Sequence, residues 1–213
     1  MNRLALASAF VLGGTLAVSA NTLTFKLNQT FGDGTIPDKP YPAGSPPWVT
    51  LVFDDHGGSG SVTMTASANL QSTTEFISDI FFNSTVDPTD IAVSGGWAGM
   101  SIERGPSNST KADGDGKYDF RFMLPTAGSG DRFDGTESFS VTLTGAGITA
   151  LTFNDLSLST GGLGPYQAAV HVQALSGGAS TWLYPGTSVP DGGATAALLG
   201  LGMLGLGLLR LRE

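Results

Sequence analysis

Apolar and polar residues alternate along much of the middle of the chain, with the two-residue period of half-buried β-strands. Residues 22–27 place Leu23, Phe25 and Leu27 on one face. The same pattern recurs in five further runs, at residues 49–53, 62–70, 118–124, 139–143 and 168–174. Two apolar runs with weaker alternation, at residues 76–82 and 181–184, are also predicted as strands. About eight short strands separated by Gly, Asp, Ser and Pro predict an all-β fold, specifically an antiparallel β-sandwich that is jelly-roll-like.

Strict alternation also predicts which side chains share a buried face. In the run 118–124 we expect Tyr118 to share the buried face with Phe120. In the run 168–174 we expect Ala174 to share that face with Val172, and His171 to point to the opposite side.

Composition and charge narrow the class of protein. Gly accounts for 31 of the 213 residues, which makes long helices unfavourable and argues against a helical bundle. The net charge of −8 leaves no basic patch for phosphates, so we expect no nucleic acid among the partners. The chain has no Cys, which excludes disulfides, zinc–thiolate sites and thiol catalysis.

The N-terminus has the three-part order of a secretory signal peptide. Arg3 is basic, residues 4–18 are uncharged and mostly apolar, and short side chains precede a cleavage site between Ala20 and Asn21. The mature chain is therefore predicted to begin at Asn21. The alternative that this pattern leaves open is a buried N-terminal helix.

A second apolar segment lies close to the C-terminus. Residues 194–209 carry no charge, and a helix of this length is about 24 Å long against the roughly 30 Å hydrocarbon core of a membrane. We therefore predict one C-terminal transmembrane helix. Arg210 and Arg212 follow it as stop-transfer residues and predict that this end stays in the cytoplasm.

The residues around this segment resemble a known class of sorting tail. Val189, Pro190 and Asp191, followed by Gly193, a short apolar helix and a basic end, look like the VPDSG-CTERM variant of PEP-CTERM tails. Position 192 departs from that variant, because Gly stands where the variant has Ser. The resemblance implies recognition by an exosortase-type membrane protease that removes the helix. A plain membrane anchor without processing is the alternative.

These observations divide the chain into three parts. Residues 1–20 are the predicted signal peptide, residues 21–184 the β-sandwich ectodomain, and residues 185–213 the spacer, sorting motif, transmembrane helix and basic end. We expect the protein to be exported, anchored in the membrane before processing, and then located at the cell surface or outside the cell. The stretches 113–119 and 169–173 also resemble segments of ectodomains that recur on PEP-CTERM proteins.

A cluster of three aspartates is the candidate metal site. Asp113, Asp115 and Asp119 follow one another at short spacing, and Gly114 and Gly116 allow the backbone to turn. Carboxylate oxygens on a turning backbone are ligands that Ca²⁺ prefers, so calcium is the candidate cofactor. The alternative is a polar turn that leads into the next strand, with Asp119 facing solvent.

Residues 54–60 bring Asp, His and Ser into one Gly-rich stretch. A hydrolase triad needs these groups to converge in space next to an oxyanion hole, which neighbours within one loop do not provide. The stretch is also not followed by a helix, as a phosphate-binding loop would be. We therefore predict a hairpin turn between two strands.

Aromatic residues provide the last candidate site. The six are Trp48, Trp97, Trp182, Tyr41, Tyr166 and Tyr184. If they are exposed together, their ring faces could bind sugar rings, whereas the alternative places them in the core of the sandwich.

Three functions stay open at this point. The first is a non-enzymatic, exported surface or matrix protein with a sorting tail. The second is a carbohydrate-binding module, either calcium-dependent or built on an aromatic platform, that associates with exopolysaccharide. The third, a hydrolase, has the least support, because the chain has only two His and shows no convergent pair of acidic residues.

Overall fold

The computed structural model describes residues 20–31, 41–72, 74–112, 116–128, 130–160 and 164–186. The strands in these residues are β1 (Thr22–Phe31), β2 (Val49–Asp54), β3 (Ser61–Ala68), β4 (Phe76–Phe82), β5 (Ala92–Gly95), β6 (Ser101–Arg104), β7 (Thr110–Ala112), β8 (Gly116–Tyr118), β9 (Phe120–Met123), β10 (Phe133–Asp134), β11 (Ser138–Thr144), β12 (Leu158–Ser159), β13 (Ala168–Leu175) and β14 (Ala179–Pro185). Three short 3₁₀ helices accompany them, namely η1 (Pro88–Asp90), η2 (Ala150–Phe153) and η3 (Ser176–Gly178). The predicted all-β class is confirmed.

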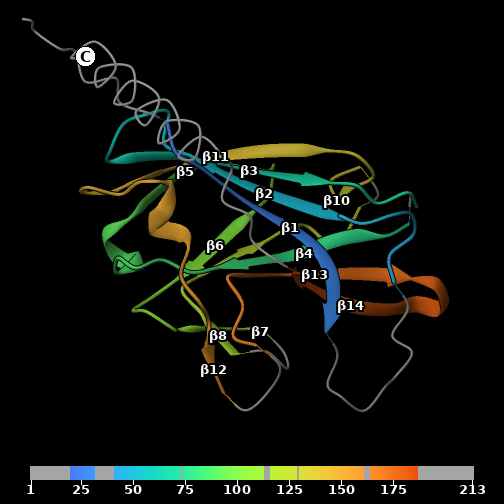
Figure 1. Cartoon of the computed structure of the whole chain (residues 1–213). Coiled ribbons are helices and arrows are strands. Elements are labelled where there is room, and N and C mark those ends of the chain that lie inside the picture. The colour runs from blue at the N-terminus through green and yellow to red at the C-terminus, as the bar shows by residue number, and fades with distance from the viewer. Residues whose placement is uncertain are drawn as a thin grey trace, which may run out of the picture.

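Eleven of these strands form one antiparallel sheet. Its hydrogen-bonded order is β5–β11–β3–β2–β1–β14–β13–β4–β9–β6, and β10 pairs with β4 beside this path. A separate small sheet has the order β12–β8–β7. Figure 1 shows the small sheet at the lower edge of the main sheet.

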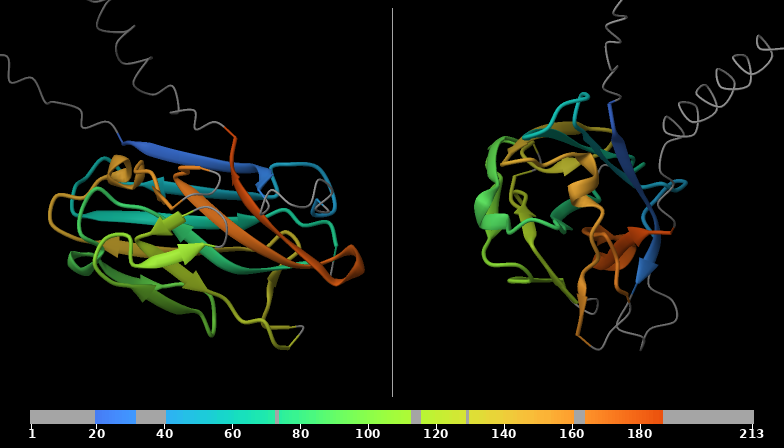
Figure 2. Two further views of the ribbon diagram at one scale, coloured as in Figure 1. Left: turned by 90° about the horizontal axis from the view of Figure 1, so that it is seen from below. Right: turned by 60° about the vertical axis from the view of Figure 1, so that its left-hand side comes forward.

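The main sheet curls until its two edges approach each other. The edge strands β5 and β6 are joined by residues 96–100 alone, and the right-hand view in Figure 2 shows the strands around a central core. Rings from opposite halves meet inside, since the centroids of Phe53 and Phe82 lie 5.4 Å apart. The two layers that we expected of a sandwich are therefore the two halves of one continuous sheet. A jelly roll, in contrast, consists of two separate sheets.

Irregularities in the middle of the sheet account for this curl. The register shifts between Leu27 and Gln29 where β1 pairs with β14. It shifts again between His171 and Val172 where β13 pairs with β4, and between Val172 and Leu175 where β13 pairs with β14. An extra residue in one strand of an antiparallel pair bends the strand and increases its twist. The ladder therefore continues around the bend instead of breaking into two sheets.

The alternating pattern fills the inside of the curl with apolar side chains. Leu23, Phe25 and Leu27 are all buried, as their spacing predicts. Phe120 stacks on Phe82 with 4.7 Å between ring centroids and 7° between ring planes. Burying side chains of this size is the main favourable contribution to folding, at roughly 1.5–3 kcal/mol for each.

Two predicted face assignments are wrong. Tyr118 does not share a face with Phe120, because Asp119 is buried and the chain passes there from the small sheet into the main sheet. Ala174 has a positive φ of 57° at the second shift in β13, so Leu175 takes the buried position instead.

The small sheet covers part of the outer face of the main sheet. Ala112 and Tyr118 of the small sheet form a second buried cluster with Phe31, Phe81 and Ala169 of the main sheet. The centroids of Phe81 and Tyr118 are 5.6 Å apart. The outer face is therefore partly apolar, although it lies outside the curled core.

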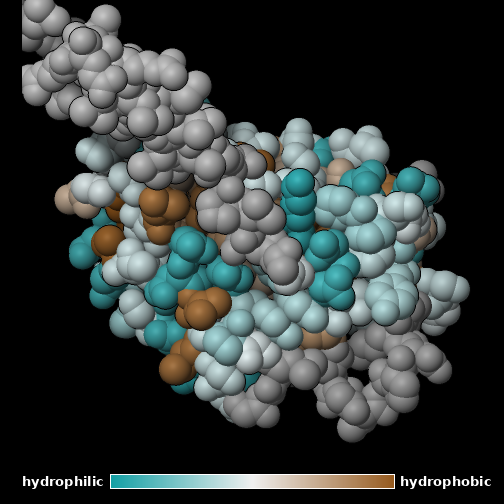
Figure 3. Space-filling model, in the orientation of Figure 1, coloured by the Kyte–Doolittle hydropathy of each residue, from teal (hydrophilic) through white to brown (hydrophobic). Residues whose placement is uncertain are grey.

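The described residues on the face that Figure 3 presents are mostly polar. Figure 3 shows small apolar patches separated by hydrophilic residues on the face that it presents. No helix within the described ranges is both long and apolar enough to cross a membrane. The predicted C-terminal transmembrane helix and the signal peptide before Ala20 lie outside the described residues.

Candidate functional site

A hollow of about 450 Å³ opens on the outer face of the main sheet, beside the small sheet. We call it the polar hollow, and its lining residues are Asp79, Phe81, Lys111, Arg121, His171, Gln173, Ser180 and Trp182. They come from four neighbouring strands of the main sheet, β9, β4, β13 and β14, and from β7 of the small sheet. The pairing of the strands thus brings together residues that are up to about a hundred positions apart in the chain.

A bulge in β4 places two polar side chains on the side of the hollow. Asp79 pairs with His171 and Ile77 with Val172, so Ser78 is the extra residue between them. Neighbouring residues of a regular strand point to opposite faces, but Ser78 and Asp79 contact each other and both contact His171. Bulges are frequent beside functional sites because they re-aim side chains in this way.

Asp79 is the centre of the polar contacts. Its Oδ1 accepts a hydrogen bond from Nε of Arg121 at 2.8 Å and forms an ion pair with Nη2 of Arg121 at 2.8 Å. Its Oδ2 accepts a hydrogen bond from Ser78 Oγ at 2.7 Å and lies 3.6 Å from Nδ1 of His171. Gln173 Nε2 donates to Ser78 Oγ at 2.9 Å. The polar groups are therefore held in place by one another.

The same contacts determine the charge of Asp79. Burial alone would raise its pKa, but the contacts with His171, Ser78 and Arg121 outweigh burial and hold the pKa below its ordinary value. Asp79 is thus ionised at neutral pH. It neutralises part of the positive charge of Arg121, whose Nη1 also donates to Glu103 Oε2 at 3.3 Å.

Ser78, His171 and Asp79 do not have the geometry of a hydrolase triad. In a triad the serine and the carboxylate bind opposite nitrogens of the imidazole ring. Here Ser78 Oγ lies 3.0 Å from Nδ1 of His171, and the carboxylate of Asp79 approaches the same nitrogen. The serine hydroxyl also donates to the carboxylate directly. The arrangement holds the side chains in position. It provides no path for a proton from the serine hydroxyl through the two nitrogens of the histidine ring to the carboxylate.

A row of stacked rings borders the polar hollow. Trp182 stacks on His171 at 4.5 Å on one neighbouring strand and on Phe31 at 5.8 Å on the other. Tyr184, two residues further along β14, stacks on Tyr166 at 4.0 Å. These rings stack on one another in cross-strand register, so each ring covers part of its neighbour's face.

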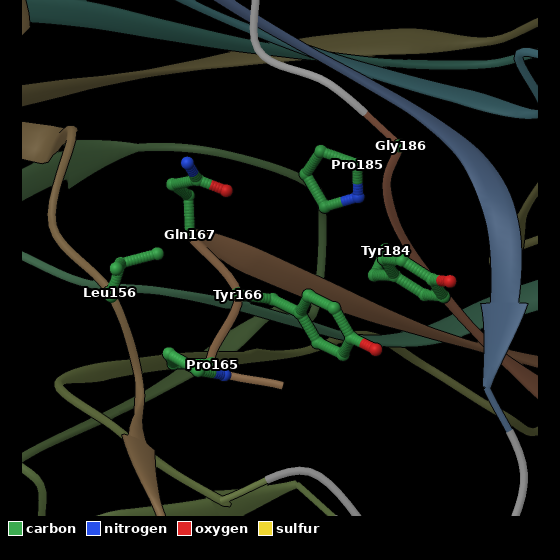
Figure 4. Close-up of a pocket in the computed structure, with 7 residues that line it drawn as sticks. All are labelled: Leu156, Pro165, Tyr166, Gln167, Tyr184, Pro185 and Gly186. Atoms are coloured by element: carbon green, nitrogen blue, oxygen red, sulfur yellow. The ribbon is translucent and has the colours of Figure 1, made fainter. Parts of the chain in front are cut away.

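A second hollow of about 430 Å³ lies beside Tyr184. We call it the aromatic hollow, and it is lined by Leu156, Pro165, Tyr166, Gln167, Tyr184, Pro185 and Gly186. Figure 4 shows the rings of Tyr166 and Tyr184 next to each other, between the two prolines. Trp182 and Tyr184 alternate with the buried Leu183, so both hollows lie along the same side of β14.

The structure brings together three of the six predicted aromatic residues, Tyr166, Trp182 and Tyr184. Trp48 is buried elsewhere, beneath the exposed ring of Tyr41, with 5.7 Å between the centroids. Trp97 lies between the edge strands of the main sheet. The three tryptophans therefore do not form one platform. Trp48 lies in the core, as the alternative prediction for these aromatic residues has it.

The candidate metal residues are only partly described. Asp113 and Asp115 lie outside the described residues. Asp119 is buried rather than facing solvent, and its two oxygens accept hydrogen bonds from the backbone N–H groups of Asn108 at 2.6 Å and Ser84 at 2.9 Å. Within the described ranges, no three acidic or histidine side chains converge as metal ligands would. Calcium binding by this cluster stays a prediction.

The predicted hairpin at residues 54–60 is confirmed, since β2 and β3 pair on either side of it, with Asp54 opposite Thr63. His56 lies exposed on this turn, and its Nε2 contacts Thr63 Oγ1 at 3.0 Å. Asp55, in contrast, is buried. The predicted cleavage residues Ala20 and Asn21 are exposed, directly before β1.

The C-terminal residues match a known family model. Residues 188–212 match the VPDSG-CTERM motif, which confirms the resemblance and is consistent with a PEP-CTERM-type exosortase sorting tail. The sorting residues Val189, Pro190, Asp191 and Gly193, with Arg210 and Arg212, lie within the match and outside the described residues. Searches of curated proteins and of solved structures found no match.

The motif defines a class of exported protein. It points to export and to membrane anchoring before processing. It also implies that an exosortase-type membrane enzyme processes the tail.

Proposed function

We propose that this chain is a non-enzymatic protein of the cell surface or extracellular matrix whose mature domain binds polysaccharide on the outer face of the sheet. One observation carries the proposal: the polar hollow and the aromatic hollow lie side by side along β14, with their polar and aromatic side chains already held in place. The sorting motif supports export to the compartment where such a ligand is found.

The chemistry of the polar hollow fits a sugar. Arg121, Asp79 and Gln173 offer planar donors and acceptors, and sugar hydroxyls both donate and accept hydrogen bonds. Within the described part of the chain, the indole N–H of Trp182 and the ammonium of Lys111 make no hydrogen bond or ion pair. They are therefore available to the oxygens of a ligand. Arg121 is already paired with Asp79 and Glu103, so Lys111 is the cation left for a ligand, and its ammonium group favours a polysaccharide that carries acidic groups.

The rings supply the apolar part of the contact. A pyranose presents C–H groups as well as hydroxyls, and aromatic side chains bury such area at low conformational cost. Trp182 is held by its neighbours on both strands, and Tyr184 is held by Tyr166. Because these rotamers are set before a ligand arrives, little ordering entropy opposes binding.

Affinity electrophoresis tests this proposal. The chain from residue 21 to 213 would be run in a detergent without a sugar headgroup, through gels that contain alginate, hyaluronan, dextran or mannan. We expect at least one gel to retard the wild type. We expect Trp182→Ala to weaken that retardation at least fivefold, and Lys111→Ala to weaken it mainly for the acidic polymers.

Matched controls lie away from both hollows. Tyr41→Ala removes the most exposed large aromatic side chain of the described residues, and Lys26→Ala removes an exposed cation on β1. Both should bind like the wild type. No retardation in any gel, or equal retardation of Trp182→Ala, would contradict the proposal.

A further inference from the structure

A buried carboxylate, Asp55, lies near the first residues of β1. The proposed polysaccharide site does not use it, because that site lies near the last residue of β1, Phe31. Asp55 accepts four hydrogen bonds, and every donor is neutral. Its Oδ1 accepts from the backbone N–H groups of Asn21 at 2.8 Å and Gly57 at 3.0 Å. Its Oδ2 accepts from Asn21 Nδ2 at 3.1 Å and the backbone N–H of Ala150 at 3.3 Å. Within the described ranges, no Lys, Arg or His forms an ion pair with Asp55.

Asp55 is therefore a negative charge in a buried position without a cation. Burial alone would raise its pKa, but the hydrogen bonds from Asn21, Gly57 and Ala150 together hold the pKa below its ordinary value. The carboxylate is thus ionised at neutral pH, although only 3% of the residue is exposed. Buried charges in proteins are usually paired.

Asn21, which supplies two of the four donors, is also the residue at which the mature chain is predicted to begin. Its position depends on the sheet: the carbonyl oxygen of Asn21 accepts from the backbone N–H of Asp55 at 3.2 Å, and Thr22 pairs with Asp54. In a cleaved chain the nitrogen atom of Asn21 is still bonded to its own Cα, so the same backbone contacts would hold it beside Asp55. Ala20 itself is exposed.

We propose that Asp55 is the binding site for the α-ammonium group that signal-peptide cleavage creates on Asn21. Hydrolysis would break the bond between the carbonyl carbon of Ala20 and the nitrogen of Asn21. The carbon takes the hydroxyl of water, the nitrogen takes the remaining hydrogen, and the amine then takes up the proton that the new carboxyl group of Ala20 releases. An α-amino group has an ordinary pKa of about 8, so it is charged at neutral pH. The neutral amide at 2.8 Å from Asp55 thereby becomes a cation at the same place, and cleavage supplies the missing ion-pair partner.

The mature domain is then more stable than the uncleaved chain, because a hydrogen bond between two charged groups is stronger than one with a neutral donor. The proposal rests on the predicted cleavage site but not on polysaccharide binding. It also gives a physical reason for that site, since a chain that began one residue earlier or later would not bring its ammonium group to Asp55.

Thermal unfolding of four proteins tests the proposal. A chain that begins at Asn21, released from a fusion partner by a protease that leaves no extra residue, is compared with a chain that begins at Ser19. Each is made with and without Asp55→Asn, and all extend to residue 213 in detergent. We expect the chain that begins at Asn21 to melt roughly 2–4 °C higher. We expect Asp55→Asn to remove this difference.

Asp54→Asn is the matched control, because Asp54 belongs to the same turn but its carboxylate contacts His56. In this variant the chain that begins at Asn21 should still melt at a higher temperature than the chain that begins at Ser19. Equal melting temperatures of the two wild-type starts, or a difference that persists in Asp55→Asn, would overturn the proposal.

A second measurement tests the proposal without the Asp55→Asn variant, and so does not depend on whether that variant folds. The rate at which an amine reagent acylates the N-terminus of the chain starting at Asn21 is compared with the rate for the peptide Asn-Thr-Leu-Thr. The ion pair predicts acylation at least tenfold slower in the folded chain, and an equal rate would overturn the proposal. A mature protein that begins at a residue other than Asn21 would overturn it as well.

Discussion

Asp55, Asp79 and Asp119 are buried aspartates in different surroundings, although burial alone would raise the pKa of each. Hydrogen bonds from neutral donors lower the pKa of Asp55, and a histidine, a serine and a guanidinium lower that of Asp79. For Asp119, burial outweighs its two backbone hydrogen bonds, and the nearby charges of Asp155 and Asp87 raise the pKa further. The same residue type therefore has three different electrostatic environments in one domain.

The lowered pKa of Asp79 makes a prediction about acid stability. A carboxylate whose pKa is lower in the folded than in the unfolded state stabilises the fold above its unfolded pKa, here about 3.8. That contribution is lost as the pH falls through the lower, folded pKa. From pH 5 down to pH 2 the wild type should therefore lose more stability than Asp79→Asn, as measured by urea unfolding at each pH.

Asp131→Asn, which removes an exposed carboxylate, is the control for the general effect of one fewer negative charge. It should follow the wild-type curve more closely than Asp79→Asn does. Identical acid dependence in the wild type and in Asp79→Asn would show that the contacts of Asp79 do not stabilise the fold.

The polar hollow could be predicted only in part from the sequence. Trp182 was a candidate because of its residue type, and His171 was expected on the outer side of its strand. Asp79 and Arg121 were missed, because they meet through the pairing of β4 with β9 and through a bulge that alternation does not reveal. One signal was present: Ser78 and Asp79 interrupt an otherwise apolar run.

At the scale of elements, alternation located the longer strands and the four-residue β9, but not the other short strands. Strands of six or more residues, such as β2, β3 and β11, have enough positions to show a two-residue period. The strands β5, β6, β7, β10 and β12 have two to four residues and show none. The curl was likewise hidden, because the register shifts in β1, β4 and β13 that bend the sheet follow from strand pairing, which alternation does not reveal.

The buried face of β9 gives a prediction about stability. Phe120 is fully buried against Phe82, so Phe120→Asp would place a charge in the core. We expect a loss of roughly 3 kcal/mol or more in the free energy of unfolding, measured with urea. Met123→Gln, on the other side of the same strand, should cost less than about 1 kcal/mol. A wild-type melting temperature for Phe120→Asp would contradict the assigned core.

At the scale of the whole molecule, the sorting tail is the part that the sequence alone identified most specifically. Its recognition depends on the local order of a short motif, an apolar run and a basic end, all of which can be read directly from neighbouring residues. A binding face, in contrast, depends on contacts between distant strands. This difference explains why the sequence indicates where the protein goes more clearly than what its domain binds.

Mass spectrometry of the chain recovered from the surface or the medium of the native host tests the central claim most directly. Proline disfavours helical backbone, and proteases bind extended segments, so we predict that Pro190 is part of the recognised motif. We predict a chain that begins at Asn21 and ends within residues 189–193, and we predict that the double variant Pro190→Ala, Asp191→Ala accumulates uncleaved in the membrane. Recovery of chains that begin at Met1, or that end at Glu213 in both wild type and variant, would contradict the account.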